Sequence, residues 1–106
     1  MIEDRLEPKA ARQLRGLILT MVYVNHNRQR TRLTSTVIGG TLHSEGYQFS
    51  RQDILTMIQD MRERGYLRFQ SMRDDDSHLF IFEIELTSAG RDLVDGLRTD
   101  PAVQTQ

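Results

Sequence analysis

The segment Ser50–Leu67, SRQDILTMIQDMRERGYL, decides the fold of this chain. Its serine is followed three residues later by Asp53, which is the pattern of a capping box at the start of a helix. Apolar residues then recur at helical spacing: Ile54, Ile58 and Met61. Two arginines in the last turn suit the helix dipole, and Gly65 supplies a left-handed stop. The segment predicts a helix with one buried stripe that breaks into an aromatic-rich strand.

Two more helices are expected upstream. Pro8 suits the first turn of a helix, and Lys9 to about His26 carries an apolar stripe, so we expect a helix there. The polar and basic stretch Asn25–Arg32 then connects it to a second helix. Possible caps for that helix lie at 34–36, and Gly46 ends it. The short turn Tyr47–Phe49 then joins this second helix to the helix that begins at Ser50, which is the connection expected of a helix-turn-helix.

A β-hairpin is expected after Gly65. Residues 66–72 and 78–86 alternate as half-buried strands around the polar loop Arg73–Ser77. In the return strand His78, Phe80, Phe82, Ile84 and Leu86 lie on one side, and we expect Phe80 and Phe82 in the core. Thr87 and Ser88 then cap a closing helix over Ala89–Leu97.

These elements predict an α+β fold, mainly α, in which three helices precede a two-stranded wing and a short C-terminal helix: a winged helix-turn-helix. We expect a flexible N-terminus over 1–8, the winged helix-turn-helix domain over 9–98 and a disordered tail over 99–106. The expected core comprises thirteen side chains: Leu17, Ile18, Met21, Ile38, Leu42, Phe49, Ile54, Ile58, Met61, Leu67, Phe80, Phe82 and Leu93.

Charge is divided unevenly along the 106 residues. Residues 1–73 hold twelve Lys or Arg against seven Asp or Glu, whereas residues 74–106 hold two against eight. The balances of +5 and −6 sum to the formal net charge of −1. Basic character therefore gathers in the part that carries the helix-turn-helix, which favours a nucleic-acid partner, although arginines on solvated helix faces would look the same.

Composition also limits the cellular compartments in which the chain could function. Cysteine is absent, which excludes disulfides and thiolate chemistry and fits a reducing compartment. The polar, acidic start is unlike a secretory signal, and the longest apolar run is too short to span a bilayer. We expect a cytoplasmic protein with no membrane association.

Two strings carry a resemblance to a known group of proteins. The first runs from Ile54 through Met61-Arg62-Glu63-Arg64-Gly65-Tyr66-Leu67, and the second is Glu85-Leu86-Thr87-Ser88-Ala89-Gly90-Arg91-Asp92-Leu93. Together they resemble winged-helix regulators of the MarR and PadR kind. In that group the recognition helix ends in a basic pair before glycine, and the wing runs into a Leu-Thr-x-x-Gly turn. The resemblance covers about residues 33–97.

The resemblance implies a small transcriptional regulator that binds double-stranded DNA, with residues 50–64 in the major groove. Four outward side chains would read bases: Arg51, Gln52, Thr56 and Gln59. Six arginines would contact phosphates: Arg28, Arg30, Arg32, Arg62, Arg64 and Arg68. The plainer alternative is that these are ordinary solvated positions on an amphipathic helix.

Two features depart from that pattern. The expected wing tip is Asp74-Asp75-Asp76, whose carboxylates would be repelled by phosphates. Leu55 stands where a DNA reader more often carries a small or polar side chain. Both features suit a rival hypothesis, in which the winged helix binds a protein partner through Leu55 and the acidic wing and does not bind DNA directly.

Catalysis and metal binding are not expected. His26, His43 and His78 are scattered through different elements without a second ligand at metal-like spacing. The loop at 74–77 lacks the ligand spacing and the glycine of a calcium loop. No nucleophile–base constellation is apparent, so we expect neither an enzyme nor a cofactor.

A homodimer is expected from the first helix. Leu19, Tyr23 and Val24 lie beside its core stripe, and a winged helix gains affinity by binding two half-sites as a symmetric dimer. The alternative is that residues 1–8 or the closing helix cover these side chains within one chain.

Overall fold

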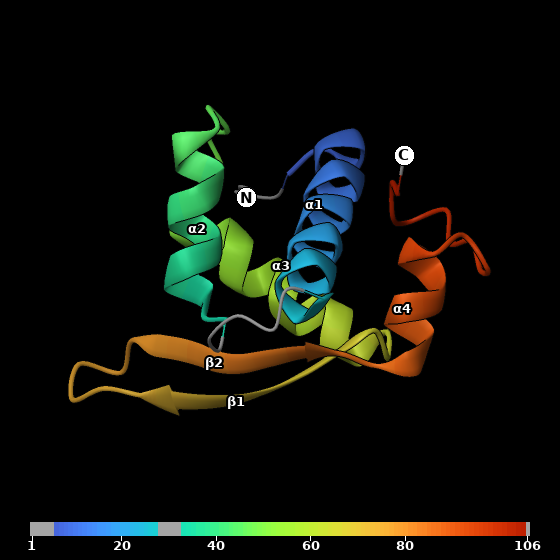
Figure 1. Cartoon of the computed structure of the whole chain (residues 1–106). Helices are drawn as coiled ribbons and strands as arrows, with labels where there is room; N and C mark the ends of the chain where they lie inside the picture. The colour runs from blue at the N-terminus through green and yellow to red at the C-terminus, as the bar shows by residue number, and fades with distance from the viewer. Residues whose placement is uncertain (1–5, 28–32, 106) are drawn as a thin grey trace.

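Four helices stand on one side of a two-stranded sheet in the computed structural model, which describes residues 6–27 and 33–105 (Figure 1). The order along the chain is α1 (Pro8–Asn27), α2 (Ser35–Ser44), α3 (Arg51–Glu63), β1 (Leu67–Arg73), β2 (Leu79–Leu86) and α4 (Ser88–Val94). The predicted α+β, mainly helical class is therefore confirmed. The closing helix is shorter than the expected Ala89–Leu97, and Leu97 lies 77% exposed beyond its end.

Local sequence signals set the helix ends. The Ser50 hydroxyl accepts from the Asp53 amide while the Asp53 carboxylate accepts from the Ser50 amide, so the predicted capping box is complete. Gly65 has a φ of 87°, a left-handed conformation that glycine adopts without a Cβ penalty, and it directs the chain from α3 into β1. Thr87 caps α4 by accepting from the Gly90 amide, as expected.

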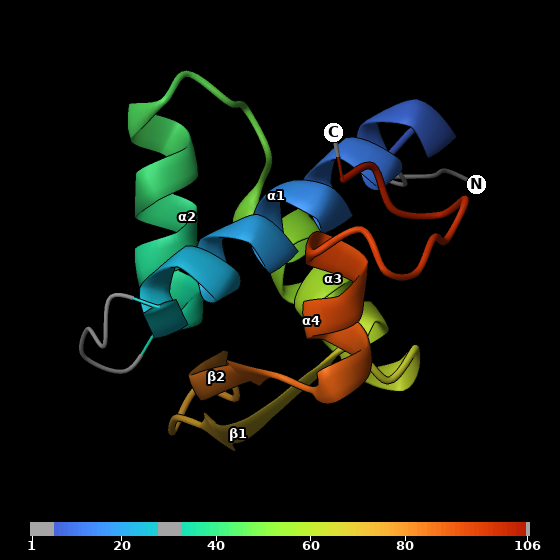
Figure 2. The ribbon, with the colours of Figure 1, turned by 45° about the vertical axis from the view of Figure 1, so that its right-hand side comes forward.

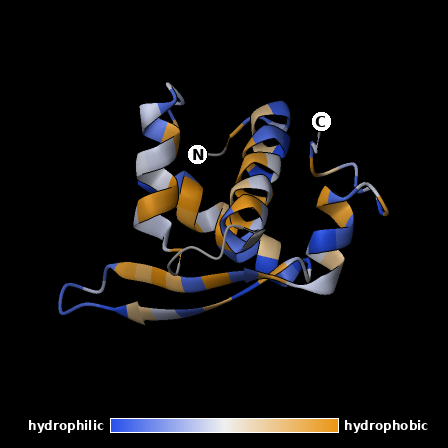
Figure 3. Cartoon of the chain, in the orientation of Figure 1, coloured by the Kyte–Doolittle hydropathy of each residue, from blue (hydrophilic) through white to orange (hydrophobic). Residues whose placement is uncertain are grey.

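The core lies where α1, α2 and α3 meet above the sheet, and apolar residues face inward along these helices (Figure 3). Eight of the thirteen predicted core side chains are buried: Ile18, Ile38, Leu42, Ile54, Ile58, Met61, Leu67 and Leu93. Three more are partly buried against them: Leu17, Met21 and Phe49. The predicted set omitted several buried residues, among them Leu14, Leu19 and Val22 of α1, because α1 is covered on more than one side.

The assignment of β2 side chains to the core was wrong for Phe80 and Phe82. Ile81 is fully buried, while the two phenylalanines stack on each other with ring centroids 5.8 Å apart. The cause is a β-bulge. Arg68 pairs with Glu85, but Gln70 pairs with Phe82, so two β2 residues oppose one β1 residue. Glu83 in the bulge has a φ of 55°, and beyond it the inward side passes to Ile84 and Leu86, which the predicted core did not include.

The segment expected to be disordered has a defined course in its described part, where residues 100–105 return along α1 (Figure 2). Val103 is only 4% exposed and belongs to the core, and the Gln104 amide donates to the Arg12 carbonyl over 3.1 Å. The polar composition of this segment did not predict its one buried apolar residue or its backbone hydrogen bonds. At the other end, Leu6 packs partly against the core just before α1.

Candidate nucleic-acid interface

Helix α3 has one covered face and one free face. Its covered face buries Ile54, Ile58 and Met61 at 4% exposure or less, as the helical spacing predicts. Of the four predicted base readers, three are exposed (Arg51, Gln52 and Thr56) and Gln59 is half-buried. The structure therefore brings these four together on one helix.

The first turn of α3 is tied to the hairpin. One Arg51 Nη donates to the Leu79 carbonyl at the start of β2, over 2.9 Å. A guanidinium has five N–H donors, so this bond leaves others for a ligand. Gln52 Nε2 donates to Thr56 Oγ1 over 3.1 Å, one turn further on. Arg51 thus ties the hairpin to the helix, while Gln52 and Thr56 orient each other on the free face.

The predicted phosphate contacts at the end of α3 all have partners within the chain. The Arg62 guanidinium lies 4.5 Å from the centre of the Phe69 ring. Arg64 Nε lies 2.8 Å from Asp60 Oδ2, one helical turn earlier. Arg68 Nε lies 3.0 Å from Glu85 Oε1 across the sheet, and both side chains are more than half exposed. Exposed ion pairs of this kind contribute little to the stability of the fold, and their side chains exchange partners easily.

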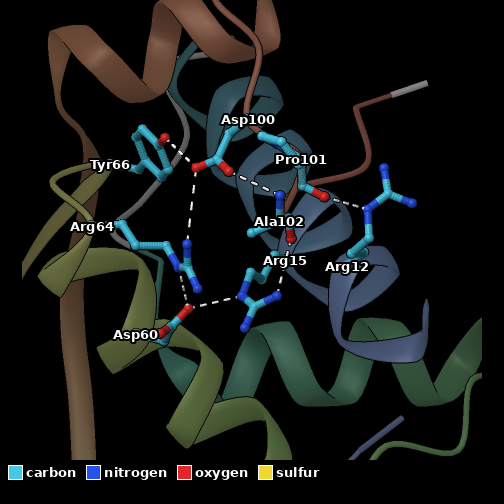
Figure 4. A network of polar contacts seen from close by, with 8 residues as sticks. All are labelled: Arg12, Arg15, Asp60, Arg64, Tyr66, Asp100, Pro101 and Ala102. Atoms are coloured by element: carbon cyan, nitrogen blue, oxygen red, sulfur yellow. Dashed lines mark hydrogen bonds and ion pairs between the residues drawn. The ribbon is translucent and has the colours of Figure 1, made fainter. Parts of the chain in front are cut away.

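Asp60 is the centre of a larger polar network that the sequence analysis missed (Figure 4). Its Oδ2 also accepts from Arg15 Nε of α1 over 2.8 Å, and Arg64 Nη1 lies 4.0 Å from Asp100 of the C-terminal segment. Tyr66 donates its hydroxyl proton to the same Asp100 carboxylate. Only the Asp60–Arg64 pair, at helical i,i+4 spacing, was visible in the sequence. The other contacts join residues distant along the chain.

The network shifts several pKa values. Burial alone would raise the pKa of Asp60, but hydrogen bonds from Arg64 and Arg15 outweigh it and lower the pKa below 3.8. The Tyr66 hydrogen bond, together with the Ala102 amide, lowers the pKa of Asp100. Burial and the Asp100 hydrogen bond raise the pKa of Tyr66 above 10.0. The network therefore favours charged Asp60 and Asp100 beside a neutral phenol.

The wing tip is acidic and internally organised. Asp74 accepts from the amides of Asp76 and His78 over 2.9 Å each, and its second oxygen lies 3.3 Å from His78 Nδ1. The His78 amide bond in particular lowers the pKa of Asp74. Ligand atoms of Asp74, Asp76 and His78 lie within 4.8 Å of one another, all on exposed side chains. The sequence analysis, which predicted no metal site, did not bring His78 to this loop.

Two predicted protein-contact sites are corrected by burial. Leu55 is only 4% exposed and belongs to the core, because α2 and the hairpin cover that side of α3 as well. Leu19 is fully buried within its own chain. Tyr23 packs partly against the core, donates to Asp95 Oδ1 over 2.6 Å and lies under Arg91, so α4 covers it. Of the predicted dimer face, only Val24 remains exposed, at 40%.

The remaining predicted phosphate contacts, Arg28, Arg30 and Arg32, lie outside the described residues. Within the described ranges, no helix is both long and apolar enough to cross a membrane. Comparison with protein families finds no family model that matches the chain, and no curated protein matches it. Inferences about function therefore depend on the site itself.

Proposed function

We propose that the chain is a winged helix-turn-helix domain that binds double-stranded DNA as a small transcriptional regulator, with α3 in the major groove. The observation that carries the proposal is the free face of α3, which presents Arg51, Gln52 and Thr56 beside a buried stripe. Helix α2, a short turn and α3 have the order of a helix-turn-helix. A major groove about 12 Å wide admits such a helix.

Base reading and phosphate binding are assigned to opposite ends of the helix. Gln52 offers a bidentate contact to adenine, and Thr56 offers a methyl group to thymine. Arg62, Arg64 and Arg68 gather where α3 passes into β1, so they would neutralise phosphates beside the groove. The partner of Arg68 does not oppose this role, because the Arg68–Glu85 pair is exposed and exchangeable. Arg64 must first loosen its pairs with Asp60 and Asp100.

The wing has a different part in this proposal. The hairpin extends well past the helices and ends in three carboxylates (Figure 1). A phosphate backbone would repel that tip, so the wing base with Arg68 faces the DNA and the tip stays clear of it. Arg51, through its bond to Leu79, fixes the angle between wing and helix.

The rival hypothesis of a protein-binding module loses one of its two supports. Leu55 was its apolar anchor, and that side chain is buried in the core. The acidic tip alone remains. A homodimer that reads two half-sites stays a prediction, but its contact cannot use Leu19, which the chain itself covers.

Selection of duplexes from a random library on the purified chain at low salt tests the proposal. We expect an enriched sequence whose binding weakens steeply with salt, because neutralised phosphates release counterions. Gln52→Ala should relax the preference, whereas Arg62→Ala should weaken all sequences alike and reduce the salt slope by about 0.9. Lys9→Ala, which removes one exposed charge at the far end of α1, is the matched control.

Two results would end the proposal. One is a selection that enriches no sequence. The other is a salt slope that Lys9→Ala reduces as much as Arg62→Ala does, which would mean that only general basicity attracts DNA. Sedimentation of the chain with and without the selected duplex reports whether one or two copies bind.

A further inference from the structure

The C-terminal segment 100–105, here called the strap, is docked on α1 through a short exposed connection. Residues 95–99 between α4 and the strap are all exposed, and Gly96 has a φ of 82°. The strap then lies along the first half of α1 (Figure 2), and Figure 4 shows it beside Arg12 and Arg15. An exposed connection and a separate docking surface allow the strap to leave without unfolding α4.

Few contacts hold the strap, and arginines make most of them. Arg12 Nε donates to the Pro101 carbonyl, and Arg15 Nη1 donates to the Ala102 carbonyl over 3.0 Å. In return, the Gln104 amide donates to the Arg12 carbonyl. Within the described part of the strap only Val103 is fully withdrawn from solvent. Docking therefore depends on one apolar anchor and on donors that a different acceptor could engage.

Gly16 is the position on α1 that permits docking. A Cβ built there would overlap the backbone carbonyl of Gln104, so any larger residue must displace the strap. Glycine is otherwise unfavourable inside a helix, by about 1 kcal/mol relative to alanine. Gly16 is thus explained by the close approach of the strap and not by the needs of α1.

Docking also lowers the positive charge of the network in Figure 4. With the strap in place, Arg15 and Arg64 face two carboxylates, Asp60 and Asp100. When Asp100 departs, the same two cations face Asp60 alone, which leaves a local charge of +1. Arg12 and Arg15 simultaneously lose their carbonyl acceptors. With Arg12 included, release thus raises the charge of the cluster from +1 to +2 and frees its donors, as phosphate binding requires.

We propose that the strap is an autoinhibitory contact that masks an anion-binding cluster of Arg12, Arg15 and Arg64, and that its release exposes this cluster to the phosphates of nucleic acid. This inference rests on the proposed function, because Arg64 is one of the phosphate contacts assigned there. The docked strap supplies what a phosphate would supply, namely oxygen acceptors and one negative charge.

The full-length Gly16→Ala variant tests docking. The added methyl should eject the strap while favouring the α1 helix, so the amides of Val103 and Gln104 should exchange with solvent much faster than in the original chain. The matched control is Gly40→Ala, because the corresponding methyl in α2 meets nothing within 4 Å. Val103→Asp provides an independent release from the strap side.

Binding to a duplex of about 20 base pairs and to heparin then tests masking. We expect both release variants to bind both polyanions more tightly than the original chain and the Gly40→Ala control. Each phosphate newly neutralised should steepen the salt slope for the duplex by about 0.9. Asp100→Asn, which removes the carboxylate while keeping the strap, should show a smaller gain in the same direction.

The outcomes separate this inference from the proposed function. Unchanged exchange in both release variants overturns the docked strap, and faster exchange without tighter binding to either polyanion overturns the masking. Tighter binding to both polyanions without an enriched sequence in the library selection would retain the strap and remove the proposed function. An enriched sequence together with unchanged binding by the release variants would retain the proposed function and remove the masking by the strap.

Discussion

At the scale of single residues, two neighbours on α3 differ in burial. The sequence alone did not predict which of them is buried. Leu55 is 4% exposed, whereas Thr56, the next residue, is exposed on the free face. The helix stripe at 54, 58 and 61 did not include residue 55, because a stripe assumes that the helix is covered on one side. Here the covered arc is wider, since α2 and the hairpin both pack on α3.

Leu55→Ala should therefore lower the free energy of unfolding by about 3 kcal/mol, the range for truncating a buried leucine. Thr56→Ala, one residue on, should change it by no more than about 0.5 kcal/mol. Denaturant unfolding of the two variants beside the parent checks both values. A negligible cost at Leu55 would mean that this side chain is accessible, and the rival protein-binding hypothesis would regain its anchor.

At the scale of elements, the bulge in the hairpin decides what each face of β2 does. One extra residue near Glu83 reverses the alternation, so Ile81 enters the core and the Phe80–Phe82 pair does not. Strict alternation over residues 78–86 predicted that Phe80 and Phe82 face the core. An alternating pattern does not reveal a bulge when no glycine marks its position.

Ile81→Ala should destabilise the chain more than Phe82→Ala, although phenylalanine is the larger residue. The expected cost at Ile81 is about 2–4 kcal/mol, because truncation of a fully buried side chain leaves a cavity. The half-buried Phe82 loses mainly its stacking partner, a contact of about 1 kcal/mol. Thermal or denaturant unfolding ranks the two variants, and the opposite ranking would indicate a hairpin without the bulge.

At the scale of the whole molecule, the polar network joins four parts of the chain. Arg15 belongs to α1, Asp60 and Arg64 to the last turns of α3, Tyr66 to the junction with β1, and Asp100 to the strap segment. Loosening any one contact is felt by the others, since Asp60 and Asp100 share their arginines.

The pH dependence of stability follows from the shifted pKa values. Asp60 and Asp100 have lowered pKa values when folded, so their contribution is complete above about pH 4. It is lost as the pH falls through their folded pKa values, below 3.8. Tyr66 has a raised pKa, so its contribution is complete below pH 10. That contribution disappears as the pH rises through its folded pKa, above 10.0.

Measurements of unfolding from pH 2 to 11 should therefore show a plateau with losses at both ends. Tyr66→Phe should reduce the loss of stability at alkaline pH, and Asp60→Asn should reduce part of the loss at acid pH. Both variants should be less stable than the parent on the plateau. His26→Gln, at an exposed end of α1, is the control. Parallel curves for all four proteins would show that Tyr66 and Asp60 do not contribute to the pH dependence of stability.

The sequence by itself determined the elements of this protein. Local signals act within one turn of chain, so the capping box at Ser50, the stop at Gly65 and the cap at Thr87 were readable in advance, as was the buried stripe of α3. The residues expected to read DNA were implied by the resemblance to winged-helix regulators, and they remain a prediction.

Only the tertiary structure decided which surfaces remain free. Leu19 and Leu55 looked available because burial depends on partners distant along the chain, and both side chains belong to the core that the packed helices form. The strap looked disordered because a polar segment with one valine gains order only from the backbone donors and acceptors of α1. Burial and hydrogen bonding are properties of pairs of residues, and the pairing of Arg15 with Asp60, or of Tyr66 with Asp100, is set by the packing of helices.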